Sequence, residues 1–152
     1  MVNGVIAMMT EKYLSELCKS YYDLKYSFYQ LISVMCKDDG LTVLQSMTLF
    51  LIRSEDSVTI GDLSRYFNIT HSNASSMCKK LEKDGLILRR RSVTDERSVI
   101  LSLSEEGTAV LERMLKRGKV LTDPLNDIPQ ERLDRVLTTI REATALISDM
   151  EH

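Results

Sequence analysis

The sequence predicts a mainly α-helical protein with one small β-hairpin. Apolar residues recur every three or four positions in most of its segments, which is the spacing of amphipathic helices. Two short helical patterns meet at a tight turn, Asn68-Ile69-Thr70, in the middle of the chain. After Gly85, a basic run and an alternating run from Arg97 to Leu103 read as two strands joined by a turn. Together these features indicate a winged helix-turn-helix between flanking helices.

The first element is a long helix over about Thr10–Lys37, ended by Asp38-Asp39-Gly40. Its apolar stripe runs for about seven turns without glycine or proline. We expect part of this stripe to meet a second copy of the chain, so residues 1–40 are assigned to dimerisation. The alternative is a helix that lies across its own domain. The stripe comprises Leu14, Leu17, Cys18, Tyr21, Leu24, Phe28, Leu31, Ile32 and Met35.

Residues 41–104 are expected to form the winged helix-turn-helix. Hydroxyl residues precede each of its expected helices, and they are typical N-caps. Gly85 fits the left-handed position just beyond the end of a helix. The expected elements are a helix from Thr42 to Ile52 with a Thr42–Gln45 capping box, a short and possibly lone strand at Ser57–Thr59, helices at Ile60–Phe67 and His71–Asp84, and a hairpin over Leu88–Leu103.

The second helix of the helix-turn-helix has an unusually polar outer face. Short hydroxyl and amide residues are poor helix formers, so their concentration here favours contact with DNA over an ordinary solvated surface. The inner face holds Ile69, Ala74, Met77, Cys78 and Leu81. We expect groove contacts from Ser72, Asn73, Ser75 and Ser76, with adenine as a partner for Asn73, and phosphate contacts from Lys79 and Lys80.

The hairpin begins with a basic strand, from which Arg89, Arg90 and Arg91 are expected to contact phosphates. At its tip, Asp95 precedes Arg97 by two residues and would orient that guanidinium toward a minor groove. Substituting Arg97 by alanine is expected to weaken binding by roughly 1–3 kcal/mol. The alternative is an ordinary charged turn.

Charge is sorted along the chain. The net charge of −2 by itself argues against nucleic acid, but residues 71–97 hold seven bases and four acids, a net charge of +3. The length of 152 residues and the 43% hydrophobic content suit a folded domain. We find neither a membrane span nor a secretion signal, and three separated cysteines suit a reducing cytosol, so a cytoplasmic protein is expected.

Residues 105–152 are expected to form two more helices that take part in dimerisation. Ser104 would cap the first, which runs to about Leu121, and a break follows at Pro124. Pro129 fits the first position of the last helix. That helix carries one apolar stripe, made of Leu133, Val136, Leu137, Ile140, Ala143 and Ile147.

The chain resembles the multiple antibiotic resistance regulator (MarR) family of winged-helix transcription factors. The matching motifs are Leu81 to Ile87 followed by Arg89, then Asp95-Glu96-Arg97-Ser98, then Leu101 to Gly107. The resemblance implies a homodimer that binds a pseudo-palindromic operator in double-stranded DNA. Members of the family mostly act as repressors, and many release DNA when a small, often phenolic, ligand binds between the dimer and DNA-binding regions. It also implies roles in DNA contact for Ser75, Arg89 and the Asp95–Arg97 pair. One departure is Ser76, where many members have arginine; Lys79 or Lys80 would substitute.

Other chemistry has fewer candidates. A small aromatic or phenolic effector would be held by Tyr21, Tyr22 and Tyr26, with Arg65 fixing its polar end. Some relatives sense oxidants through a cysteine of the first helix, which makes Cys18 a redox candidate, although a free cysteine is more often a small hydrophobe. No spacing suits a metal, a cofactor or a catalytic group, so an enzyme is not expected. A winged helix that docks proteins and ignores DNA is the rival function.

Overall fold

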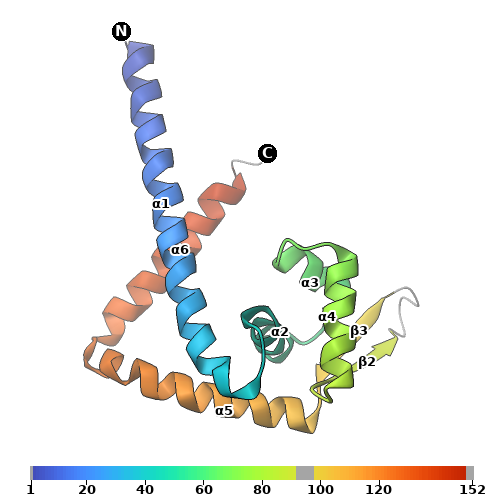
Figure 1. Ribbon diagram of the computed structural model, residues 1–152. Helices are drawn as coiled ribbons and strands as arrows, with labels where there is room; N and C mark the ends of the chain where they lie inside the picture. Colours follow the sequence, from blue (N-terminus) through green and yellow to red (C-terminus); the bar gives the residue numbers. More distant parts are fainter. Residues whose placement is uncertain (1, 92–97, 150–152) are drawn as a thin grey trace. The chain divides into compact units, whose positions relative to one another are not determined.

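The computed structural model describes residues 2–91 and 98–149, with side chains from residue 11 onward except at 124–125. It confirms a mainly helical fold with a small antiparallel sheet, and it forms two compact units, residues 1–118 and 119–152 (Figure 1). The elements are α1 (Val2–Cys36), the 3-10 turn η1 (Lys37–Asp39), α2 (Val43–Ser54), β1 (Val58–Thr59), α3 (Ile60–Tyr66), α4 (His71–Lys83), β2 (Ile87–Arg91), β3 (Val99–Leu103), α5 (Glu105–Thr122), the 3-10 turn η2 (Asp123–Asp127) and α6 (Gln130–Asp149).

The first helix begins earlier than expected, at Val2 instead of about Thr10. Asn3 and Gly4 are poor helix formers, and no capping residue marks the start of the helix. These first turns could therefore not be predicted from the sequence. The end of the helix is as expected: the chain leaves α1 through η1, and Gly40 takes the left-handed conformation with φ of 64°.

Two reciprocal capping boxes fix the starts of α2 and α3. The Thr42 hydroxyl accepts from the backbone N–H of Gln45, whose side chain accepts from the Thr42 N–H at 2.9 Å, as the sequence predicted. The same exchange joins Thr59 to Asp62. The hydrogen bonds from Thr59, and secondarily the charge of Arg65, lower the pKa of Asp62. At pH values above the pKa that Asp62 has in the unfolded chain, the ionised carboxylate therefore stabilises the fold. This contribution is lost as the pH falls through the lowered pKa of the folded protein.

The short strand β1 is not alone, because it forms the edge of a three-stranded antiparallel sheet of order β1-β3-β2. Val58 lies opposite Leu101, and both are buried. A two-residue strand has no period to detect in the sequence, so only its partner in space reveals the pairing. The sheet packs against α2, α3 and α4, which places the hairpin beside α4 (Figure 1).

Helix α5 begins in close contact with the connection between α4 and β2. The Ser104 hydroxyl caps α5 by accepting from the Gly107 N–H at 2.9 Å, and the Ser104 N–H donates to the Leu86 carbonyl at 3.1 Å. A Cβ atom at Gly107 would lie 1.9 Å from that same carbonyl oxygen. Only glycine allows this approach. The core behind it comprises Cys36, Leu49, Ile52, Val58, Ile60, Leu63, Ala74, Cys78, Leu81, Leu86, Ile87, Leu101, Val110, Leu111 and Met114.

Charged groups join the end of α1 to α5. The Asp39 carboxylate, only 8% exposed, forms ion pairs with Arg117 and, at 3.4 Å, with Arg113. Arg117 also donates from its Nε to the Met35 carbonyl at 2.7 Å. Met35 itself lies against Gly118, which has no side chain to keep it away. The base of α1 is thus fixed on α5 by polar and apolar contacts together.

The second unit holds α6, and none of its side chains is buried. The side chains of its apolar stripe are exposed or half-exposed within the described residues. The described part of α1 repeats this pattern, since its residues from 11 to 30 are all exposed. The large apolar side chains concerned include Leu14, Leu17, Tyr21, Leu24 and Phe28 on α1 and Val136, Leu137, Ile140 and Ile147 on α6.

Candidate nucleic-acid interface

The turn between α3 and α4 is fastened by the chain's own polar groups. Asn68 adopts a left-handed conformation with φ of 49°, which asparagine tolerates better than most residues. The Ser64 hydroxyl donates to the Ile69 carbonyl at 2.6 Å, and the Ile69 N–H donates back to the Ser64 carbonyl at 3.1 Å. The hydrogen bond of Ser64 was not predicted from the sequence.

Helix α4 divides into a buried and an exposed face, as expected. Ala74, Cys78 and Leu81 are fully buried in the core. Thr70 caps the helix by accepting from the Asn73 N–H at 3.2 Å, and Asn73 in the first turn is exposed. Ser75 is half-buried at the edge of the outer face. The exposed residues of that face are His71, Ser72, Asn73, Ser76, Lys79, Lys80 and Lys83.

A Schellman motif ends α4 and directs the chain into the hairpin. The Gly85 N–H donates to the Glu82 carbonyl at 3.0 Å, and the Leu86 N–H donates to the Leu81 carbonyl at 2.9 Å. Gly85 has φ of 75°, which confirms the left-handed residue expected there. Leu86 and Leu81 are both buried, the apolar contact that usually accompanies this motif. The direction of β2 relative to α4 is therefore set locally.

The three arginines of β2 do not share one environment. Arg90 and Arg91 are exposed, as phosphate contacts require. Arg89 departs from that expectation: its side chain is only 18% exposed, and its Nη1 lies 3.2 Å from the Glu82 carboxylate. The predicted tip residues Asp95 and Arg97, and the turn at 92–96, lie outside the described residues.

The lysines of α4 stay accessible. Lys80 pairs with Asp84 one turn later, at 2.8 Å, but remains 62% exposed, so this pair leaves its charge available to a ligand. The exposed cations of α4 and β2 thus come from two neighbouring elements of one rigid region, α4 packing directly on β2.

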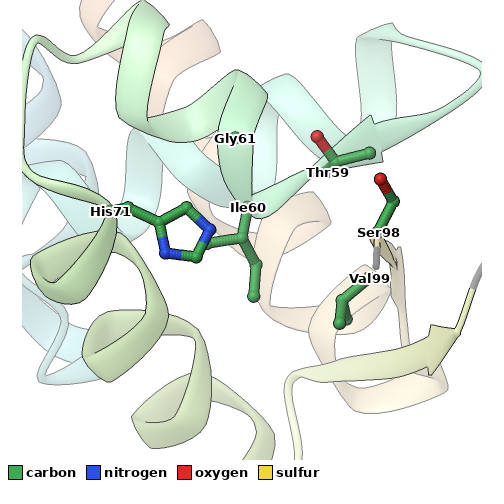
Figure 2. A pocket seen from close by; sticks show the side chains of 6 residues that line it. All are labelled: Thr59, Ile60, Gly61, His71, Ser98 and Val99. Carbon is green, nitrogen blue, oxygen red and sulfur yellow. The ribbon is translucent and has the colours of Figure 1, made fainter. Parts of the chain in front are cut away.

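A small cavity of about 150 Å³ lies where α3, α4 and β3 begin. Figure 2 shows the His71 ring on one side of it, and the hydroxyls of Thr59 and Ser98 on the other. Ile60, Gly61 and Val99 complete its walls. A few waters or one small ring would fill this volume. The cavity could not be predicted from the sequence, because the residues that line it come from three separate segments.

The residues expected to hold an effector are not brought together in the described part of the chain. Tyr21 and Tyr22 meet edge to face with ring centroids 5.4 Å apart, and both are exposed, as is Tyr26. Arg65 lies on α3, 81% exposed and paired with Asp62. None of these residues lines the cavity beside His71.

The three cysteines differ in accessibility. Cys18 is exposed on α1, whereas Cys36 and Cys78 are buried, and all three are free thiols. Burial raises the pKa of Cys78 to about 11, although the charge of Arg89 works in the opposite direction. Cys78 therefore carries almost no thiolate near neutral pH, and Cys18 is the thiol that solution reagents reach.

Two features of other protein classes are absent from the described residues. No cluster of three or more histidine, cysteine, aspartate or glutamate side chains is placed to hold a metal ion. No helix in this part of the chain has the length and apolar character needed to cross a bilayer.

Comparison with known proteins agrees with this geometry. Residues 30–114 match the family model described as "Transcriptional regulator SarA/Rot". The chain is 27% identical over 141 residues to the HTH-type transcriptional regulator SarZ of Staphylococcus epidermidis, a match covering 92% of this chain and 88% of SarZ. It is 32% identical over 74 residues to the organic hydroperoxide resistance transcriptional regulator of Bacillus subtilis. This match covers about half of each protein.

Solved structures share the fold. AbfR of Staphylococcus epidermidis superimposes with a TM-score of 0.77 at 20% identity, covering 93% of this chain and 97% of AbfR. Reduced AbfR bound to DNA gives a TM-score of 0.73 at 22% identity, over 94% and 97% of the two chains. Because the family model covers more than half of the sequence and the fold is that of the MarR-type winged helix, the chain belongs to the SarA/Rot family of DNA-binding transcriptional regulators.

Proposed function

We propose that the protein acts as a homodimer that binds an inverted-repeat operator, with α4 in the major groove and the hairpin on the adjacent backbone. The exposed polar face of α4 carries this proposal, because it joins short hydrogen-bonding side chains to lysines. Ser72, Asn73, Ser75 and Ser76 would face base edges, and Lys79, Lys80, Arg90 and Arg91 would face phosphates. Asp95 and Arg97 keep their proposed role at the tip of the wing.

The exposed apolar side chains of α1 and α6 support the dimer. A stripe of large side chains left in water is costly, and a second copy of the same chain would bury it. A twofold dimer presents two copies of α4, so half-sites should lie about one helical turn of DNA apart. In the cytoplasm, a protein bound to such an operator within a promoter would block transcription. We therefore propose that it is a repressor.

Replacing Lys79 by alanine tests the assignment of phosphate contacts. We expect affinity to fall for every duplex alike, and the slope of log K against log salt to become shallower by about 1 for each contact removed. Fluorescence anisotropy between 50 and 300 mM salt measures both quantities. Lys116, exposed on α5, provides the control: its alanine variant should keep the wild-type slope. Equal slopes for wild type and the Lys79 variant would remove Lys79 from the interface.

A redox response through Cys18 is a second candidate, and the accessibility of this thiol favours it. One relative is named for organic hydroperoxide resistance, and AbfR has been solved on DNA in both reduced and overoxidized forms. In the proposed step, the Cys18 thiolate attacks one peroxide oxygen. An S–O bond forms, the O–O bond breaks, and the products are a cysteine sulfenic acid and an alcohol. A polar group would then lie on the α1 stripe expected at the dimer contact.

Mild treatment with an organic hydroperoxide should therefore lower the operator affinity of the wild type. The loss should be about tenfold or more if the free energy of dimerisation becomes less favourable by at least about 1.4 kcal/mol. Cys18→Ser should bind DNA as tightly as the wild type and should not respond. Cys36→Ser, which alters a buried thiol, should respond like the wild type. Unchanged affinity after peroxide, with sulfenic acid confirmed by mass spectrometry, rules out this regulatory role.

Release by a small aromatic effector is a further part of the proposal. The tyrosines of α1 offer stacking surfaces, and Arg65 offers a cation on another helix. Titration with salicylate-like compounds should raise the melting temperature and weaken operator binding together. If neither changes up to millimolar concentration, this effector class is excluded.

A further inference from the structure

We propose that Arg89 is a positioning residue that holds the hairpin at a fixed distance from α4 through Glu82, and is not itself a DNA contact. This inference rests on the proposed DNA-binding function and refines it. It concerns how the two DNA-contacting elements are kept in register with each other.

The strand register places the Arg89 side chain on the inner face of the sheet. Arg89 lies directly opposite Leu101, and opposed residues of an antiparallel pair share a face. Leu101 is 3% exposed and belongs to the core. Arg90, the next residue, lies opposite Ile100 on the other face of the sheet. The alternation of the strand thus turns Arg89 inward toward α4 and Arg90 away from it.

The contacts of Arg89 agree with this placement. Its Nη1 is 3.2 Å from the Glu82 carboxylate on α4, and its Nε is buried, with no hydrogen-bond partner among the residues that the structure describes. Its positive charge is felt by the Cys78 thiol, one turn before Glu82. The guanidinium therefore lies along the Cys78–Glu82 side of α4, and its ion pair links β2 to α4 through two residues that are seven apart in sequence.

This arrangement matters because α4 and the hairpin would contact different parts of the same duplex. An error of about 1 Å in their relative position weakens one contact when the other forms. The motif at Gly85 sets the direction of the connection, and the Arg89–Glu82 pair adds a second link farther along both elements. One link would leave the hairpin free to rotate relative to α4, and the second link fixes the angle between them.

Glu82→Ala separates this role from simple electrostatics. It removes a negative charge from α4 and frees Arg89, so electrostatics alone predicts tighter DNA binding; loss of the positioning contact predicts weaker binding, by about threefold to tenfold. Asp84→Ala is the matched control, since Asp84, the residue directly after α4, pairs with Lys80 one turn earlier in the same helix. That variant should bind as tightly as the wild type or more tightly.

Arg89→Ala and the double variant complete the test. Arg89→Ala should weaken binding without changing the salt slope, and adding Glu82→Ala should cost nothing further, because the pair acts as one unit. Thermal melting of each variant checks that it is folded. If Arg89→Ala does not fold, the DNA affinity of Glu82→Ala alone tests the proposal. Tighter binding by Glu82→Ala, or a slope reduced by about 1 in Arg89→Ala, would overturn the proposal. Failure of the wild type to bind any duplex would instead refute the proposed function.

Discussion

Gly107→Ala should destabilise the protein by about 3 kcal/mol or more, the largest stability effect expected of any substitution considered. Alanine in a helix normally stabilises by up to about 1 kcal/mol relative to glycine. Here that gain is outweighed, because the new Cβ would lie 1.9 Å from the Leu86 carbonyl oxygen and 2.8 Å from its carbon. Both are backbone atoms, so no side-chain rotation relieves the contact.

Relieving it requires α5 to move away from the connection between α4 and β2. The Leu86 carbonyl also accepts from the Ser104 N–H, so this movement breaks the hydrogen bond that seats α5. Urea denaturation followed by circular dichroism measures the loss, with an accompanying fall in melting temperature of roughly 10 °C. Operator affinity should fall as well, because the displaced backbone is the root of the hairpin.

Gly61→Ala is the matched control, also a glycine near the start of a helix. Its new Cβ would meet only the Thr59 hydroxyl, at 3.6 Å, an ordinary contact. Its free energy of unfolding should stay the same or rise by up to about 1 kcal/mol. If Gly107→Ala were as stable as Gly61→Ala, the close approach of α5 to Leu86 would be wrong.

Ile140→Glu should convert the proposed dimer to monomers and lower operator affinity by on the order of 100-fold. Ile140 belongs to the apolar stripe of α6, and 37% of it is exposed in the isolated chain. A carboxylate there would be buried without a partner in the proposed dimer, which costs several kcal/mol. Sedimentation velocity measures the mass, and anisotropy with a full operator measures the lost bivalent binding.

Thr138→Glu places the same charge on the opposite face of α6 and should leave both the dimer and its affinity unchanged. If the monomer does not fold alone, circular dichroism of Ile140→Glu will show unfolding instead of dissociation, and either result supports the interface. A dimer of wild-type mass and wild-type affinity in Ile140→Glu would show that α6 lies outside the interface.

Local signals explain what the sequence alone predicted well. The capping residues Thr42, Thr59 and Thr70 and the left-handed position at Gly85 depend on interactions within a few residues, and each is found as expected. The two faces of α4 follow from helical periodicity and are likewise confirmed. These features need no knowledge of distant parts of the chain.

Features that depend on long-range packing could not be predicted. The pairing of β1 with β3, the approach of Gly107 to Leu86 and the cavity beside His71 each join segments far apart in sequence. The run Arg89-Arg90-Arg91 reads as three equivalent cations until the register with β3 turns Arg89 inward. The start of α1 was missed for another reason, since Asn3 and Gly4 argue locally against a helix.

Selection of bound duplexes from a random pool tests the central claim most directly. The proposed homodimer predicts an enriched inverted repeat whose half-sites are centred about 10 base pairs apart, with adenine favoured where Asn73 reaches the groove. The Asn73→Ala protein, selected in parallel, should lose the preference at that position and keep the symmetry. Enrichment of a lone half-site, or of no sequence at all, would contradict a twofold dimer that reads DNA through α4.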